Sequence, residues 1–412
     1  MIKFSESTLD NGLKVIHHRD ESVPLVCVNV LYDVGARDED EDKTGFAHLF
    51  EHLMFGGSIN IPNYDEPLQK VGGENNAFTT NDLTNYYLTV PYPNVETGFW
   101  LESDRMLSLA FSEKSLEVQR NVVIEEFKQR YLNQPYGDVW LLMRPLAYKH
   151  HPYKWDTIGK EISHIENARM EDVKDFFNRF YNPSNATLVI AGSIGFEQCM
   201  DLARKWFEPI SPGVKFKRVL TPEPAQTEKR SLKVTRPVPV SALYKVWHMP
   251  CRMDPDYHAW DLLSDIFGRG NSSRLQVNLV QKKKIFSEIN MSVSGDLDPG
   301  LLVFSGKLLP GISPEAGEEA LEEELEKFRK NGAGEQELGK VINKAESSLI
   351  FSEISLQNRA FNLALASLMG NTSMINEEAE KYRKVKKEQL TDIMLNKVVD
   401  SNASVVYYNA DL

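Results

Sequence analysis

Residues 44–57 read TGFAHLFEHLMFGG, and this stretch predicts a short helix. Thr44 is a residue type favoured at helix N-caps, and the acidic run 38–42 leads into it. We expect the helix to continue through about Phe55, because Gly56-Gly57 supplies residues that commonly end a helix.

The polar residues of this helix form a pattern suited to metal binding. His48 and His52 stand four residues apart, which on a helix puts both imidazoles on one face, about one turn apart. Both can then bind one zinc ion, and Glu51 lies near the same face, where its carboxylate can take a proton from a metal-bound water. The pattern H-x-x-E-H arises by chance in roughly one chain of this length in a hundred. The alternative to a metal site is a charged helix face with two surface histidines.

Further motifs accompany this helix along the chain. They are GARDE at 35–39, GGENNAFT at 72–79, RNVVIEE at 120–126, HPY at 151–153, YNPSN at 181–185 and GRGNSSRL at 268–275. With residues 45–57 they resemble the pitrilysin and mitochondrial-processing-peptidase family of zinc peptidases, the inverzincins, whose metal helix has the H-x-x-E-H form. The resemblance covers nearly the whole chain. It implies a zinc-dependent endopeptidase that hydrolyses unstructured peptides, with Glu51 as the catalytic base.

The order of predicted elements indicates an α+β fold with two similar tandem domains, each a mostly antiparallel sheet packed with helices. Both halves run strand, helix, strands, helices, strand, which suggests a duplication. We expect an N-terminal zinc-binding domain over 1–212, a proline-rich linker over 213–233 and a homologous C-terminal domain without metal over 234–412. The family resemblance adds that two such chains dimerise into a clam-shell chamber.

Three longer segments give particular expectations for secondary structure. Residues 115–130 show helical periodicity, 234–248 read as a strand, and 335–368 read as a long helix. Each of these predictions rests on the spacing of apolar residues alone.

The third zinc ligand comes from the resemblance, which places a glutamate on the helix predicted for 115–130. The family motif aligns this ligand with Glu126, and the adjacent Glu125 is the fallback. Neighbours on a helix diverge by about 100°, so only one of the two can face a given metal ion. The family often has a further, supporting glutamate where this chain has Gln119. A glutamine there keeps a hydrogen bond but not the charge.

Substrate binding is expected at Asn76, Ala77, Phe78 and Thr79. A peptidase of unstructured chains can hold the substrate backbone as an added strand at a sheet edge, which demands little of the substrate sequence. The family presents such an edge at this segment, and its small and polar residues allow close backbone approach. The alternative is a polar turn before a core strand.

The second half departs from family members that act alone. Those members carry an Arg and a Tyr that are thought to contact substrate and stabilise the oxyanion, at positions where this chain has Val280 and Ser287. An apolar side chain cannot make the bidentate contacts of a guanidinium, and serine is too short to replace a phenol. We therefore expect a heterodimer in which a related subunit supplies the Arg and the Tyr, with a homodimer as the alternative.

Composition limits the remaining possibilities. The formal net charge is −12 at pH 7, which argues against nucleic acid because phosphate neutralisation needs clustered Lys and Arg. No apolar run approaches the roughly 20 residues that cross a bilayer, so we expect no membrane span. The three cysteines, Cys27, Cys199 and Cys251, lie far apart, which suits a reducing compartment. No signal peptide is visible at the N-terminus, so we expect a cytoplasmic protein, and prior removal of a leader is compatible with the sequence.

One competing function comes from a different class. The family fold is shared by non-catalytic or weakly active assembly subunits, including core proteins of respiratory complexes. Those relatives characteristically lose the zinc residues, whereas His48, Glu51, His52 and Glu126 are all present here. The sequence therefore favours the peptidase.

Overall fold

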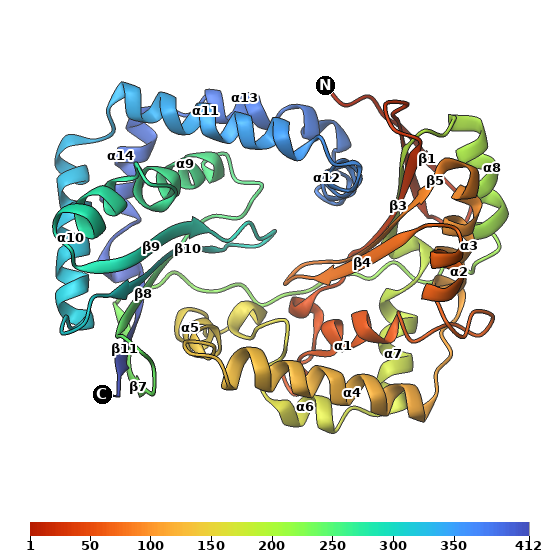
Figure 1. Ribbon diagram of the computed structural model, residues 1–412, viewed down its shortest axis with the longest axis horizontal. Coiled ribbons are helices and arrows are strands. Elements are labelled where there is room, and N and C mark those ends of the chain that lie inside the picture. The colour runs from red at the N-terminus through yellow and green to blue at the C-terminus, as the bar shows by residue number, and fades with distance from the viewer. Residues whose placement is uncertain (412) are drawn as a thin grey trace. The chain divides into compact units, whose positions relative to one another are not determined.

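The computed structural model describes residues 1–411, which form two compact units (Figure 1). Unit 1 comprises Met1–Lys128, Trp155–Leu220 and Ile350–Glu377, and unit 2 comprises Gln129–Lys154, Thr221–Leu349 and the chain from Glu378 onward. Each unit is a sheet packed with helices, as expected from the order of elements. The units interleave along the chain and so differ from the contiguous domain ranges expected above, whose boundaries stay a prediction.

Unit 1 contains a six-stranded sheet in the order β1-β2-β6-β3-β5-β4. All neighbouring strands are antiparallel except β2 and β6, and Val28 at the centre pairs with Leu88 on one side and Ile190 on the other. The strands are β1 Ser5–Thr8, β2 Lys14–Arg19, β3 Leu25–Tyr32, β4 Glu74–Thr79, β5 Thr84–Pro91 and β6 Ala186–Gly192. Because β4 ends this order, it is an edge strand.

Helices cover both faces of the unit 1 sheet. Successive residues of a strand point to opposite faces, so Val28 lies against Gly98 of α3, whereas Cys27 and Leu31 pack with the α12 cluster that includes Leu363. The helices are α1 Phe46–Leu53, α2 Asp65–Lys70, α3 Val95–Leu107, α4 Glu113–Phe127, α6 Ile162–Glu166, α7 Met170–Phe180, α8 Phe196–Phe207 and α12 Leu356–Leu368, with short turns η1 Ala36–Asp38, η2 Tyr92–Asn94, η5 Pro183–Asn185 and η7 Thr372–Asn376.

Unit 2 contains a five-stranded sheet in the order β7-β11-β8-β10-β9, antiparallel except for β7 and β11. Alternation along β10 separates two cores: Leu302 and Phe304 join the cluster with α9 and α10, and Leu301 and Val303 join the cluster with α5. The strands are β7 Arg230–Arg236, β8 Ala242–His248, β9 Phe286–Val293, β10 Leu301–Leu308 and β11 Ala403–Ala410. The helices are α5 Val139–Ala147, α9 Tyr257–Gly268, α10 Pro314–Asn331, α11 Glu335–Ser352, α13 Glu378–Arg383 and α14 Lys387–Asn396, with short segments η3 Lys128–Leu132, η4 Pro152–Lys154, η6 Gln276–Lys282 and η8 Asp400–Asn402.

Two expected elements are each split in the structure. The strand predicted for 234–248 is interrupted between β7 and β8, where Pro237 and Pro239 supply no backbone N–H for a sheet. The helix predicted for 335–368 ends at Ser352, and α12 starts anew after Ser355, whose side chain accepts a hydrogen bond from the Asn358 N–H as an N-cap. The helix predicted for 115–130 is α4, which continues into the π-helical turn η3.

Within residues 1–411, the structure has no helix that is both long and apolar enough to cross a bilayer.

Candidate metal centre

Helix α1 presents its polar side chains on one face because its other face is fixed in the core. Phe46, Ala47, Leu49, Phe50 and Leu53 are buried. The Phe50 ring packs against the Phe176, Phe177 and Tyr181 rings at centroid distances of 5.5, 6.0 and 4.4 Å. An amphipathic helix held in this way has little rotational freedom about its axis.

The start of α1 differs from the sequence expectation. The N-cap residue is Gly45, with φ of 86°, and the helix begins at Phe46 without a side-chain cap from Thr44. Instead the Glu39 carboxylate accepts hydrogen bonds from the Gly45 N–H (2.9 Å) and the Ala47 N–H (2.8 Å). Thr44 is not the N-cap because its hydroxyl has other partners. The hydroxyl forms a hydrogen bond with His164 Nδ1 and accepts one from the Lys160 N–H.

Glu39 therefore accepts the hydrogen bonds that an N-cap side chain would accept, although it lies outside the helix. It is 7% exposed, and burial raises the pKa of its carboxyl well above its ordinary value, while the hydrogen bonds from Ala47 and Gly45 act in the opposite direction. An acidic side chain also interacts favourably with the positive end of a helix dipole. Glu39 belongs to the motif GARDE at 35–39, but the sequence alone assigns it no role. A buried glutamate seven residues before the first residue of a helix carries no local signal for such a contact.

Helix α4 brings Glu126 to the two histidines of α1. The Glu126 Oε2 atom lies 3.7 Å from His48 Nε2 and 3.5 Å from His52 Nε2. One potential ligand atom from each of the three residues falls within 4.8 Å of the other two. Glu125 lies elsewhere: its side chain is 60% exposed and accepts a hydrogen bond from Lys128 Nζ at 2.8 Å. The geometry thus favours Glu126 over Glu125 as the third donor.

The donor set fits a zinc ion. Zinc takes histidine nitrogen and carboxylate oxygen at about 2.0–2.2 Å in tetrahedral geometry, which puts neighbouring donors roughly 3.3–3.6 Å apart. The His52 to Glu126 separation falls in this range, and the His48 to Glu126 separation is just outside it. Small side-chain movements would therefore close the site around a metal ion.

Glu51 lies on the same helix and is held by the edge strand. Thr79, the last residue of β4, donates a hydrogen bond from Oγ1 to Glu51 Oε2 at 2.6 Å. Tyr86 and Tyr181 are buried near it with their hydroxyl oxygens 3.2 Å apart. Burial raises the pKa of both phenols well above the ordinary value, and the nearby Glu51 charge adds to the effect. Both tyrosines therefore stay neutral beside an acidic side chain.

The expected substrate segment coincides with the edge strand. Asn76, Ala77, Phe78 and Thr79 all belong to β4, which pairs on one side with β5. The Asn76 side chain is exposed, and its Oδ1 accepts a hydrogen bond from the Ala77 N–H. Phe78 packs edge-on against Phe361 of α12, with ring centroids 5.1 Å apart. The strand is thus anchored by its side chains while one backbone edge stays at the margin of the sheet.

The residues that depart from the family pattern lie as follows. Gln119 is half-buried on α4, seven residues and so about two turns before Glu126. Val280 packs against the main hydrophobic core of unit 2. Ser287 is exposed on β9 and donates a hydrogen bond to the Lys307 carbonyl. Neither Val280 nor Ser287 offers a charged group.

Comparison with known proteins identifies the family. Residues 14–148 match the model described as insulinase (peptidase family M16), and residues 167–345 match the peptidase M16 inactive domain. The zinc protease PqqE of Helicobacter pylori is 32% identical over 383 residues, which cover 86% of this chain and 84% of that protein. The chain belongs to peptidase family M16.

Two further comparisons agree with this assignment. A crystal structure of a protease from Helicobacter pylori has a TM-score of 0.93 and 28% identity, covering 99% of this chain and all of that one. A probable mitochondrial-processing peptidase subunit beta of Arabidopsis thaliana is 24% identical over 271 residues, or 65% of this chain and 51% of that protein. All three candidate metal donors and Glu51 lie in the part that matches the insulinase model and outside the part that matches the inactive domain.

Proposed function

We propose that this chain is a zinc-dependent endopeptidase that hydrolyses unstructured peptides. The observation that carries the proposal is the convergence of His48, His52 and Glu126 donor atoms within 4.8 Å, with Glu51 on the same helix face. Its relative PqqE is named a zinc protease, which supports the metal and the reaction class.

The side chains of the site would divide the reaction between them. His48, His52 and Glu126 would hold the zinc ion, which would supply the Lewis acidity that makes water a nucleophile near neutral pH. Glu51 takes the proton of the attacking water and later delivers it to the leaving amine. Thr79 holds one oxygen of the Glu51 carboxylate and so fixes the direction from which the proton is taken.

The edge strand β4 would hold the substrate. A peptide added beside Asn76–Thr79 gains main-chain hydrogen bonds that do not depend on its sequence. Because Thr79 bonds Glu51, a strand in that place lies next to the catalytic base. The requirement for an extended conformation restricts the substrates to unfolded chains.

The first test of the proposal is metal dependence. We expect about one zinc ion per purified chain. Removal of the metal with a chelator should lower the rate of hydrolysis of an unfolded peptide at least about 100-fold. Activity should return with Zn²⁺ but not with Mg²⁺, because a two-histidine site suits zinc. Elemental analysis measures the zinc content, and a quenched-fluorescence peptide assay measures the rate of hydrolysis. Full activity in metal-free protein would contradict the proposal.

We further propose that the active form is a heterodimer with a related subunit. Val280 has no side-chain donor, and the Ser287 hydroxyl is too short to replace a phenol and already donates to the Lys307 carbonyl. One oxyanion donor is worth about 10²–10³ in rate. The Arabidopsis relative is itself named a subunit, which agrees with an assembly of more than one chain. The alternative is a homodimer with differently assisted catalysis.

The partner proposal predicts that a related subunit carrying the Arg and the Tyr raises kcat by about 10²–10³ over the chain alone. Peptide hydrolysis is measured with each subunit alone and with the mixture, and sedimentation gives the assembly state. A chain that already works at full speed alone, as a homodimer, contradicts the heterodimer.

The rival function is a non-catalytic assembly subunit. Its support is that the second half matches a domain described as inactive. The peptidase is favoured over this rival because the candidate donors all lie in the half that matches the insulinase model.

A further inference from the structure

The turn at residues 35–39, here named the support turn, contacts both parts of the proposed active site. Glu39 bonds the first N–H groups of α1, as described above. On the other side, the Ala36 N–H donates to the Thr80 carbonyl at 3.1 Å, and Thr80 follows directly after β4. Five consecutive residues therefore connect the start of the metal helix to the end of the edge strand.

The support turn is packed too closely to move without disturbing its neighbours. A Cβ on Gly35 would lie 2.5 Å from backbone atoms of Asn81 and Asp82. The Arg37 N–H donates to the Asn81 carbonyl at 2.9 Å, and the buried Arg37 side chain pairs with Asp82 at 2.9 Å. A shift of the turn would therefore shift the loop between β4 and β5.

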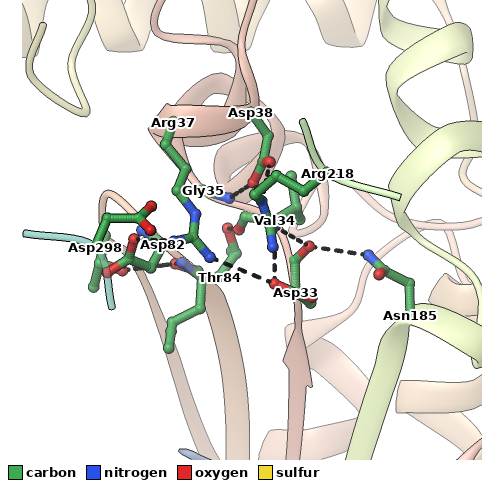
Figure 2. Close-up of polar contacts among 12 residues, drawn as sticks. Asp33, Val34, Gly35, Arg37, Asp38, Asp82, Thr84, Asn185, Arg218 and Asp298 are labelled. Carbon is green, nitrogen blue, oxygen red and sulfur yellow. Dashed lines mark hydrogen bonds and ion pairs between the residues drawn. The ribbon is translucent and has the colours of Figure 1, made fainter. Parts of the chain in front are cut away.

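Arg218 in the expected linker holds the support turn from outside. Its guanidinium donates from Nε to Asp38 Oδ1 (2.6 Å) and from Nη2 to Asp38 Oδ2 (2.9 Å) and Asp33 Oδ1 (2.8 Å), as Figure 2 shows. The Asp38 side chain is 0% exposed and also accepts from the Gly35 N–H at 3.0 Å. A carboxylate buried to this degree needs a cationic partner to remain charged.

The linker around Arg218 is extended, and most of its residues are exposed. Residues 211–227 form no helix or strand, and Lys215, Lys217 and Val219 are exposed. Phe216 and Arg218 are instead half-buried against unit 1, and the Phe216 and Phe180 ring centroids lie 4.8 Å apart. Two side chains thus dock this part of the linker on unit 1, and only Arg218 bonds the support turn.

We infer that Arg218 is a positioning residue for the active site, so that docking of the linker and binding of zinc favour each other. The inference rests on the proposed function. Arg218 fixes Asp38, and the next residue, Glu39, fixes the N-terminus of the helix that carries His48 and His52. Bidentate pairing makes the arginine geometry specific, so lysine cannot replace it fully.

The first experiment measures zinc affinity by competition with a chromogenic chelator. We expect Arg218→Met to raise the zinc Kd about 10-fold, within the usual 5- to 150-fold range of coupling between sites, with Arg218→Lys intermediate. Lys217→Met, the exposed neighbour, is the matched control and leaves the Kd unchanged. Unchanged affinity in Arg218→Met overturns the inference.

A double-variant cycle separates this role from general loss of folding. In an Asp38→Asn chain the buried carboxylate that pairs with Arg218 is replaced by a neutral amide, and only the partly exposed Asp33 still pairs with Arg218. Arg218→Met should then change the zinc Kd less than about 3-fold. The thermal midpoint of the metal-free chain serves as the folding control. An equal loss of affinity in both backgrounds shows that Arg218 does not act through Asp38 and overturns the inference.

Reciprocity supplies a second readout that needs no variant. If linker docking favours zinc, then zinc must slow cleavage of the linker after Lys215 and Lys217 by a lysine-specific protease, by a factor similar to the change in Kd. A free peptide of residues 211–222 controls for direct effects of zinc on the protease. Equal cleavage with and without zinc overturns the inference. Absence of zinc binding by the wild-type chain instead overturns the proposed function.

Discussion

The substitution Glu51→Gln is expected to lower kcat for peptide hydrolysis by about 10³–10⁴ while zinc stays bound. General acid–base catalysis contributes about 10²–10⁴ in rate, and Glu51 is proposed to act twice, on the water and on the leaving amine. Glutamine has nearly the same shape and can still accept the hydrogen bond from Thr79 Oγ1, so the site keeps its geometry. Only the ability to carry a proton is lost.

The assay for this variant pairs a fluorogenic unfolded peptide with elemental analysis of the same sample. Glu125→Gln is the matched control, because it makes the same chemical change on an exposed side chain that pairs with Lys128. It should keep both zinc and activity. Retention of more than a tenth of the activity in Glu51→Gln would show that another group is the base.

The metal helix could be predicted well from sequence because its information is local. The spacing of His48 and His52 follows from helix geometry alone, and the structure has them on one face of α1. Glu126 needed the family resemblance, since its 74-residue distance from His52 contains no periodic signal. The sequence cannot choose between Glu126 and Glu125, because the choice depends on the rotation of α4 about its axis. In the structure Glu126 faces His52, whereas Glu125 pairs with Lys128.

Features that depend on tertiary contacts could not be predicted in this way. Thr44 is a good N-cap by residue type, yet Glu39 takes that function because the chain folds back to present its carboxylate. Arg218 lies in a segment without periodicity, where sequence indicates only a linker, and its bonds to Asp38 arise from packing. Likewise α12 continues a helical pattern from α11 but belongs to the other unit.

The second large effect is expected at Glu126. We expect Glu126→Gln to raise the zinc Kd by more than about 100-fold, because loss of an outer-shell partner already costs 10- to 100-fold and Glu126 is proposed to bind the metal directly. An amide oxygen is a weaker, uncharged donor, and the site would have only the two imidazoles as strong ligands. Competition with a chromogenic chelator measures the Kd, and circular dichroism checks that the metal-free chain is folded.

The neighbouring glutamate makes this experiment discriminating. Glu125→Gln removes the same charge one residue earlier on α4, so any general effect of charge on zinc affinity appears in both variants. The two side chains diverge by about 100° around the helix, so only one of them can bind the metal ion. A difference in zinc Kd between the two variants therefore reports the ligand role. If Glu125→Gln loses zinc and Glu126→Gln keeps it, then α4 is rotated in the metal-bound protein. Gln119, which shares the face of Glu126, would then turn away from the metal as well, and the donor set proposed here would be wrong.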